Sequence, residues 1–234
     1  MIILLSPAKT FNKIEVSKST NLVFPDETKF LFNKLNQLNL DDLKKVLKTS
    51  DKLTADVYNY YQSEYINKYL SSKLYGGQAF KFLNASSIKS ENLNNLYLLS
   101  AYYGLVNGNS AISKYRLDIK DKLLDISLKD YWYKEINNYL VSKYSNKTII
   151  NLSSGEYSSL LDLNNKNIIT INFGVIKDDK LVQQSMLIKR MRGMCANYLL
   201  TNDISSLPEL KNINLDGFTF NNDYSTNNLF MFTK

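Results

Sequence analysis

The chain of 234 residues is long enough to bury one hydrophobic core, and 44% hydrophobic with 22% charged residues is typical of a globular protein, not a disordered one. It has one cysteine, Cys195, and no histidine, which excludes an internal disulfide and the usual zinc sites. Any catalysis must use lysine, tyrosine, a carboxylate or bound water, and we expect neither a metal nor a cofactor. The formal charge of +7 favours an anionic partner, unless it serves solubility alone.

The first residues are apolar but do not resemble a targeting or membrane segment. Residues 1–5 are followed at once by Ser6, Pro7 and Lys9, so the run is too short for a signal-peptide core. No later stretch approaches the length of a membrane span. We therefore expect a cytoplasmic, monomeric protein that does not contact a membrane.

Three short apolar runs predict buried strands, because each is continuous and bounded by polar or small residues. They cover residues 2–5, 96–99 and 148–152, and a serine follows each of them. In a sheet flanked by helices, ligands bind at the carboxyl ends of the strands. The loops after these strands are therefore either one shared site or ordinary turns.

The rest of the chain predicts helices and further strands around this centre. Asp41 is the expected cap of a first helix, and a second is predicted over residues 55–69, with Tyr65 on its apolar face. Ser127 and Asp130 resemble a capping pair ahead of the next helix. Helices are also predicted over residues 131–143 and 189–200, and strands over residues 167–173, 180–188 (after a turn at 178–179), 217–220 and 229–232.

These elements predict one α/β (α+β) domain with a mixed central sheet flanked by helices. The chain has eight glycines and three prolines, no internal repeat and no visible linker. We therefore expect a single compact domain over residues 1–234.

Polar residues beside the predicted strands are candidates for binding or catalysis. Lys9 follows a strand and a proline that fixes its loop, which makes it a candidate anion ligand. Arg116 and Asp118 alternate with apolar residues like a strand, which places both on one face, either as a surface pair or as anion ligand and base. Glu156 lies where a helix is predicted to begin, and it either caps that helix or leaves its amides to an anion.

Arginine is rare in this basic chain. Arg116, Arg190 and Arg192 are three among 29 basic residues. The arginine side chain is a planar fork that binds phosphate or carboxylate through two hydrogen bonds, so we expect these sites to need that geometry. Lys189 completes the densest basic cluster, at the start of a predicted helix, where Lys189 and Arg192 share a face. Cations at a helix N-terminus oppose the macrodipole, which favours a bound anion over a solvated face.

A short connection between two helical patterns is a candidate contact for DNA. Residues 50–53 include Ser50 and Lys52, and a hairpin here would offer backbone amides and an ammonium group to a phosphate, independent of base sequence. Helical pairs are common, so this pattern alone is not specific.

Motifs spread over essentially the whole chain resemble those of the YaaA family of peroxide-stress proteins, in order and spacing. The opening motif Leu-Ser-Pro-Ala-Lys-Thr, at residues 5–10, is specific in that position. Residues 189–193 read Lys-Arg-Met-Arg-Gly where the family usually has Lys-Lys-Ala-Arg-Gly, which preserves the charges. The other motifs lie at residues 50–53, 79–81, 99–104, 115–118, 131–132, 151–157 and 217–218.

The resemblance implies a single α/β domain of the YaaA "cantaloupe" fold, with a positively charged cleft and a helix-hairpin-helix element that binds DNA. That element corresponds to about residues 41–69, with residues 50–53 as its hairpin. The resemblance also implies a role in peroxide stress, in which the protein limits damage linked to free intracellular iron.

We therefore weigh two functions. The first is non-specific binding of double-stranded DNA through phosphate contacts. Its expected DNA or anion ligands are Lys9, Ser50, Lys52, Lys81, Arg116, Lys189, Arg190 and Arg192. The alternative is an enzyme that acts on a small phosphorylated or nucleotide-like substrate in a basic cleft at the strand ends, with Lys9, Asp118 and Glu156 as catalytic candidates. A common site further predicts that Lys9, Arg116, Glu156 and Arg192 line one concave surface.

Overall fold

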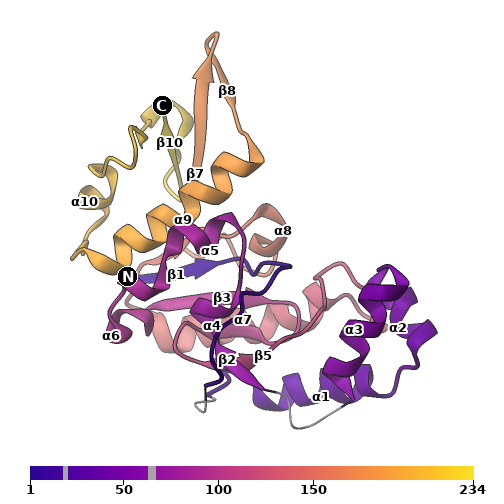
Figure 1. Cartoon of the computed structure of the whole chain (residues 1–234). Coiled ribbons are helices and arrows are strands. Elements are labelled where there is room, and N and C mark those ends of the chain that lie inside the picture. The colour runs from indigo at the N-terminus through magenta and orange to yellow at the C-terminus, as the bar shows by residue number, and fades with distance from the viewer. Residues whose placement is uncertain (18–20, 63–66) are drawn as a thin grey trace.

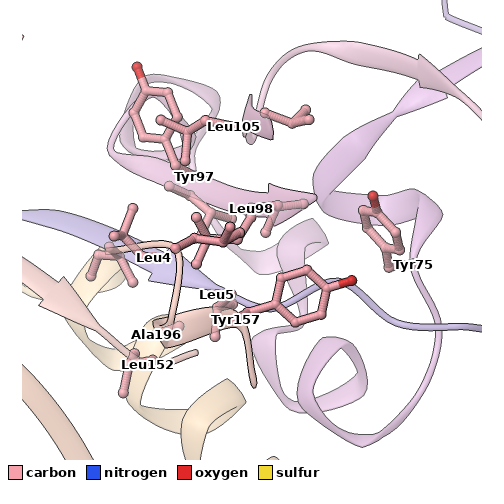
Figure 2. Packing of buried hydrophobic residues seen from close by; sticks show 14 of the residues in the cluster. Leu4, Leu5, Tyr75, Tyr97, Leu98, Leu105, Leu152, Tyr157 and Ala196 are labelled. Atoms are coloured by element: carbon pink, nitrogen blue, oxygen red, sulfur yellow. The ribbon is translucent and has the colours of Figure 1, made fainter. Parts of the chain in front are cut away.

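Parallel strands form the centre of the fold, because their side chains are apolar on both faces. The computed structural model describes residues 1–17, 21–62 and 67–234. Strand β1 (Ile2–Leu5) is fully buried and lies between β3 (Leu96–Ser100) and β6 (Ile149–Asn151), parallel to both. Figure 2 shows Leu4, Leu5 and Leu98 packed in this core. The three predicted central strands are confirmed.

The sheet is mixed because antiparallel strands flank the parallel centre. Its order is β4-β3-β1-β6-β7-β10-β9, and β8 pairs with β7. Strands β4 and β9 run antiparallel to β3 and β10, while β10 is parallel to β7. The bounds are β4 Gly104–Asn107, β7 Ile168–Lys177, β8 Lys180–Val182, β9 Thr219–Phe220 and β10 Leu229–Thr233, and a separate pair is formed by β2 (Lys68–Leu70) and β5 (Ala111–Ser113).

Helices cover both faces of this sheet, as predicted. Figure 1 shows α5 and α9 on one side of the central strands and α7 on the other. On α7, Trp132, Ile136 and Leu140 are buried, and the Trp132 indole donates a hydrogen bond to the Ala101 carbonyl. The helices are α1 Pro25–Asn36, α2 Leu40–Leu47, α3 Asp51–Tyr61, α4 Ser71–Leu74, α5 Gln78–Leu83, α6 Ser90–Leu93, α7 Leu128–Tyr144, α8 Gly155–Ser158, α9 Ser185–Thr201 and α10 Leu207–Lys211.

Helix α9 lies against α5 at a glycine. A Cβ atom on Gly193 would come within 2.0 Å of the Ala79 carbonyl oxygen, so the two backbones meet there. Met191, Cys195 and Ala196 are buried on the same helix. This close packing fixes the position of the residues on either side of Gly193.

Helices α2 and α3 form the helical pair predicted near residue 50, but the details differ. Asn39 caps α2 instead of Asp41, because its side chain accepts the Asp42 amide at 2.9 Å and Asp41 is already helical. Lys48 ends α2 with a left-handed backbone, and Ser50 caps α3. Residues 51–53 are therefore the first turn of α3, and the predicted hairpin over residues 50–53 is misplaced.

Two further boundaries were wrong. The helix predicted over residues 55–69 ends at Tyr61, because residues 68–70 pair with β5 as strand β2. The part of that prediction over residues 63–66, including Tyr65, lies outside the described residues. The strand predicted over residues 180–188 ends at Val182, and α9 begins at Ser185.

Other local predictions are confirmed. Ser127 accepts the Asp130 amide at the start of α7. Asp178 and Asp179 form the β7–β8 turn with positive φ angles of 47° and 58°. Within the described ranges, no helix combines the length and apolar character needed to cross a membrane.

Candidate functional site

The loops that follow the central strands enclose a cavity of about 480 Å³, here called the strand-end cavity. It is lined by residues 5–10, 76–80 and 115–118, by the start of α8, and by one face of α9. Its charged lining residues are Lys9, Arg116, Asp118, Glu156, Lys189 and Arg192. The predicted convergence of Lys9, Arg116, Glu156 and Arg192 is confirmed, although what they bind stays a prediction.

Two serines join the loops after β1 and β6. The Ser6 hydroxyl accepts the Ser154 amide at 2.7 Å and donates to the Ser154 hydroxyl at 3.1 Å. Behind them, the Asn151 side chain accepts the amide of Ser153 and donates to Ser158. This network fixes the floor of the cavity, because each loop holds the other.

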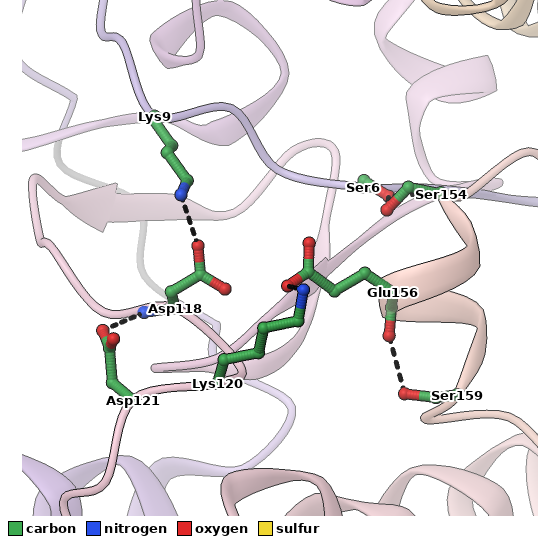
Figure 3. Close-up of polar contacts among 8 residues, drawn as sticks. All are labelled: Ser6, Lys9, Asp118, Lys120, Asp121, Ser154, Glu156 and Ser159. Carbon is green, nitrogen blue, oxygen red and sulfur yellow. Dashed lines mark hydrogen bonds and ion pairs between the residues drawn. The ribbon is translucent and has the colours of Figure 1, made fainter. Parts of the chain in front are cut away.

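Lys9 and Asp118, which both line the cavity, form an ion pair (Figure 3). The Lys9 ammonium lies 2.7 Å from Asp118 Oδ2, and the Lys9 side chain is 68% exposed against 19% for Asp118. Burial alone would raise the pKa of Asp118, but the hydrogen bond and charge of Lys9 hold it below its usual value. Asp118 is therefore ionised near neutral pH. Its other oxygen, Oδ1, is buried without a hydrogen-bond partner among the described residues.

Sequence reasoning missed Asp121, which supports Asp118 from behind. The Asp121 carboxylate accepts the Asp118 amide at 2.7 Å, and burial raises the pKa of Asp121 to about 6. The Asp-x-x-Asp spacing of residues 118–121 was the available signal, because it is typical of a turn. The structure shows that turn, with the Asp121 amide bonded to the Asp118 carbonyl. The strand predicted over residues 115–118 is wrong, since these residues pair with no neighbouring strand.

Glu156 faces the same region from α8, but it does not cap that helix. Its carboxylate pairs with the Lys120 ammonium at 2.9 Å (Figure 3), and no side chain caps α8. The capping alternative for Glu156 is therefore wrong. Lys120 was not among the predicted residues, and no motif in the sequence connects it to Glu156.

Arg192 is the least compensated charge in the strand-end cavity. Burial lowers the pKa of its guanidinium to about 10, so it stays charged at neutral pH. Its Nε is buried without a hydrogen-bond partner, and no ion pair involves it within the described residues. Lys189 lines the same cavity one turn earlier on α9.

The basic cluster does not lie at a helix N-terminus, contrary to the prediction. Helix α9 begins at Ser185, so Lys189 and Arg192 lie beyond its first turn, where the macrodipole is weak. What favours an anion near Arg192 is burial of the guanidinium. Arg190 points elsewhere, as predicted: it pairs with Asp216 at 2.8 Å and stacks on Phe82.

Three other predicted ligands also lie outside the cavity. Lys81 is exposed on α5, while Ser50 and Lys52 are exposed at the start of α3. For these three residues and for Arg190, contact with DNA or another anion stays a prediction. The structure thus separates the predicted ligands into the cavity group and these surface residues.

Tyrosines contribute to the lining of the cavity, although they were not among the predicted site residues. Tyr115 and Tyr157 line it, and the Tyr115 hydroxyl bonds to those of Tyr75 and Ser100. Burial raises the pKa of Tyr115 to about 12, so it is neutral and serves as a hydrogen-bonding group.

The strand-end cavity has no carboxylate cluster of the kind that holds a metal ion. In the part of the chain that the structure describes, no three Asp, Glu or Cys side chains are grouped for that purpose. The charged groups at the cavity are therefore the Lys9–Asp118 pair, Glu156 with its partner Lys120, and three further cations, Arg116, Lys189 and Arg192.

Comparison with known proteins identifies the family. Residues 1–224 match the family model described as "Peroxide stress protein YaaA". A UPF0246 protein of Fusobacterium nucleatum is 31% identical over 246 residues, covering 100% of this chain and 99% of the relative. A UPF0246 protein of Malacoplasma penetrans is 33% identical over 251 residues, with 100% and 99% coverage. The chain belongs to the YaaA family of peroxide stress proteins.

Proposed function

We propose that the strand-end cavity is the binding site, and the candidate active site, for a small phosphorylated or nucleotide-like substrate. The observation that carries this proposal is the partly buried guanidinium of Arg192, which has no ion pair among the described residues and whose Nε is buried without a hydrogen-bond partner. An uncompensated buried charge costs on the order of several kcal/mol, and a bound anion offsets that cost. A cavity of about 480 Å³ suits a small molecule, since ligand sites span roughly 300–1,000 Å³.

The paired groups at the other wall suit acid–base chemistry on such a substrate. Asp118 is ionised near neutral pH and lines the cavity, so it is the candidate base. Lys9 holds one of its oxygens and orients the carboxylate. Glu156, held in the same way by Lys120, is the second carboxylate available to a bound substrate.

Arg190 and Arg192, two positions apart on α9, provide a matched test of anion binding. Arg192→Met removes the buried charge, so it should abolish binding of inorganic phosphate and AMP in calorimetric titrations while the melting temperature is unchanged or higher. Arg190→Met breaks the pair with Asp216 outside the cavity, so it should lower the melting temperature and preserve binding. Equal ligand affinity in wild type and Arg192→Met would refute the proposal.

A second candidate function is non-specific DNA binding by the α2–α3 pair. The observation that favours it is the exposure of Lys48, Ser50 and Lys52 at the start of α3, where unpaired backbone amides and two ammonium groups are available to a phosphate. Lys44 is less available because it pairs with Asp51. The helix-hairpin-helix character of this pair and its role in DNA binding are parts of this proposal.

The cellular role would follow from either site. We propose a cytoplasmic, monomeric protein that limits oxidative damage linked to free iron. With no histidine and one cysteine in the chain, we expect its effect on iron to be indirect. Lys9→Ala separates the two sites: if the cavity performs the protective chemistry, this variant loses peroxide protection in cells while its DNA affinity stays unchanged. If peroxide protection and DNA affinity fall together in this variant, the cavity is part of the DNA-binding surface.

A further inference from the structure

The geometry points to a phosphate monoester whose body carries hydroxyl or amino groups as the ligand of the strand-end cavity, with the phosphate against α9 and the donors against Asp118 and Glu156. This inference rests on the proposed anion site and names the class of molecule that it takes. It follows from the lining of the cavity, in which Arg192 and Lys189 on α9 offer hydrogen-bond donors while Asp118 and Glu156 offer acceptors.

The α9 wall fits one phosphate group. Arg192 presents a partly buried guanidinium, and the exposed Lys189 adds an ammonium from the same face of the helix. Two positive charges balance a single dianionic phosphate, and the arginine fork matches its oxygens. The contact of Gly193 with the Ala79 backbone holds this wall in place.

The opposite wall accepts hydrogen bonds. One oxygen of Asp118 is held by Lys9 and one oxygen of Glu156 by Lys120, and Asp118 Oδ1 is buried with no partner among the described residues. An ionised carboxylate has no proton to donate, so a ligand atom that hydrogen-bonds to Asp118 or Glu156 must carry an O–H or N–H group. A second or third phosphate here would add negative charge beside two carboxylates that are already paired, where Arg116 is the cation with no ion pair among the described residues.

Between these walls the lining is mostly apolar. Phe80 and Leu117 face the cavity, and Met186 at the start of α9 extends its rim. This middle zone accommodates a sugar ring or a nucleoside, whose hydroxyl groups then reach the carboxylates. This pattern disfavours a simple alkyl phosphate as the ligand, because such a molecule has no donor to offer to Asp118 or Glu156.

Calorimetric titration with matched ligands tests the inference. Ribose 5-phosphate and AMP should bind at least about tenfold more tightly than butyl phosphate and 2′,3′-dideoxy-AMP, since a hydrogen bond to a charged group contributes roughly 1.5–3 kcal/mol and 1.4 kcal/mol is a factor of ten. ATP should bind more weakly than AMP. Asp118→Asn and Glu156→Gln should reduce the ratio of ribose 5-phosphate affinity to butyl phosphate affinity, with thermal melting used to confirm that each variant is folded.

The outcomes distinguish this inference from the proposed function. If all monophosphates bind equally and Arg192→Met abolishes their binding, the anion site stands and the role of the carboxylates is wrong. If ATP binds more tightly than AMP, the single-phosphate assignment is wrong. If neither inorganic phosphate nor any monophosphate binds the wild-type protein, both proposals fail.

Discussion

The Tyr61 hydroxyl donates a hydrogen bond to the Arg116 carbonyl at 2.8 Å and accepts the Arg116 amide at 2.9 Å. Tyr61 is 1% exposed at the end of α3, and Arg116 lines the strand-end cavity. The Arg116 guanidinium in turn donates to the Lys9 carbonyl. The helical pair proposed to contact DNA and the cavity proposed to bind a phosphate are therefore joined through one backbone position.

Tyr61→Phe should weaken both stability and ligand binding. The substitution leaves the buried amide and carbonyl of Arg116 unpaired, which costs roughly 1–3 kcal/mol in the free energy of unfolding. It should also lower phosphate affinity, because the loop carrying Arg116 is less well held. Tyr144→Phe, which removes a bond to Tyr97 away from the cavity, is the matched control: it should lower stability in urea titrations and leave affinity unchanged. Wild-type affinity in Tyr61→Phe would show that this tyrosine does not position the site.

Gly193→Ala should separate α9 from α5. The new Cβ atom would meet the Ala79 carbonyl oxygen at 2.0 Å, and backbone atoms cannot yield as a flexible side chain does. We expect a loss of about 1–3 kcal/mol in the free energy of unfolding, the usual cost of overpacking, or more. Gly155→Ala places its Cβ where no heavy atom lies within 4 Å, so its denaturation midpoint should stay at or above that of wild type. Similar midpoints for both variants would contradict this account of the helix contact.

Asp121→Asn should change how stability depends on pH. Because burial raises the pKa of Asp121 to about 6, the folded state is favoured while this carboxyl is protonated. That stability is fully present below the unfolded pKa of 3.8 and is lost as the pH rises through about 6. After allowance for partial exposure, the wild-type protein should lose about 1 kcal/mol in the free energy of unfolding between pH 4 and pH 7 through this group. Asp121→Asn should not show that loss.

The measurement for this pH effect is urea denaturation at several pH values. Asp125→Asn removes an exposed carboxylate from the same loop and serves as the control, with the wild-type pH dependence. If the unfolding free energy of Asp121→Asn showed the same pH dependence as that of the wild type, the proposed effect of burial on the pKa of Asp121 would be wrong.

Lys52→Ala should weaken DNA binding in a way that depends on salt. Each lysine–phosphate contact releases counterions, so losing one should reduce the slope of log affinity against log salt by about one unit. The fold should be preserved because Lys52 is exposed. Lys166→Ala, an exposed lysine at the opposite ends of the central strands, should keep the wild-type slope. Unchanged slopes in both variants would place the DNA contact elsewhere.

The sequence by itself determined the local elements of this fold. The three apolar runs became β1, β3 and β6, Ser127 capped α7 through the Asp130 amide, and Asp178 with Asp179 formed a turn. Each of these depends on residues within a few positions of one another. The convergence of the strand-end loops was also predictable, because the carboxyl ends of parallel strands meet at one edge of the sheet.

Only the tertiary structure decided which groups in the site are paired and which are left uncompensated. The partner of Glu156 is Lys120, that of Arg190 is Asp216, and Arg192 has none within the described residues. Likewise, β2 exists because it pairs with β5, more than 40 residues away. Such pairings depend on distances set by the packing of whole helices and strands, and the burial that shifts a pKa has no counterpart in the local sequence.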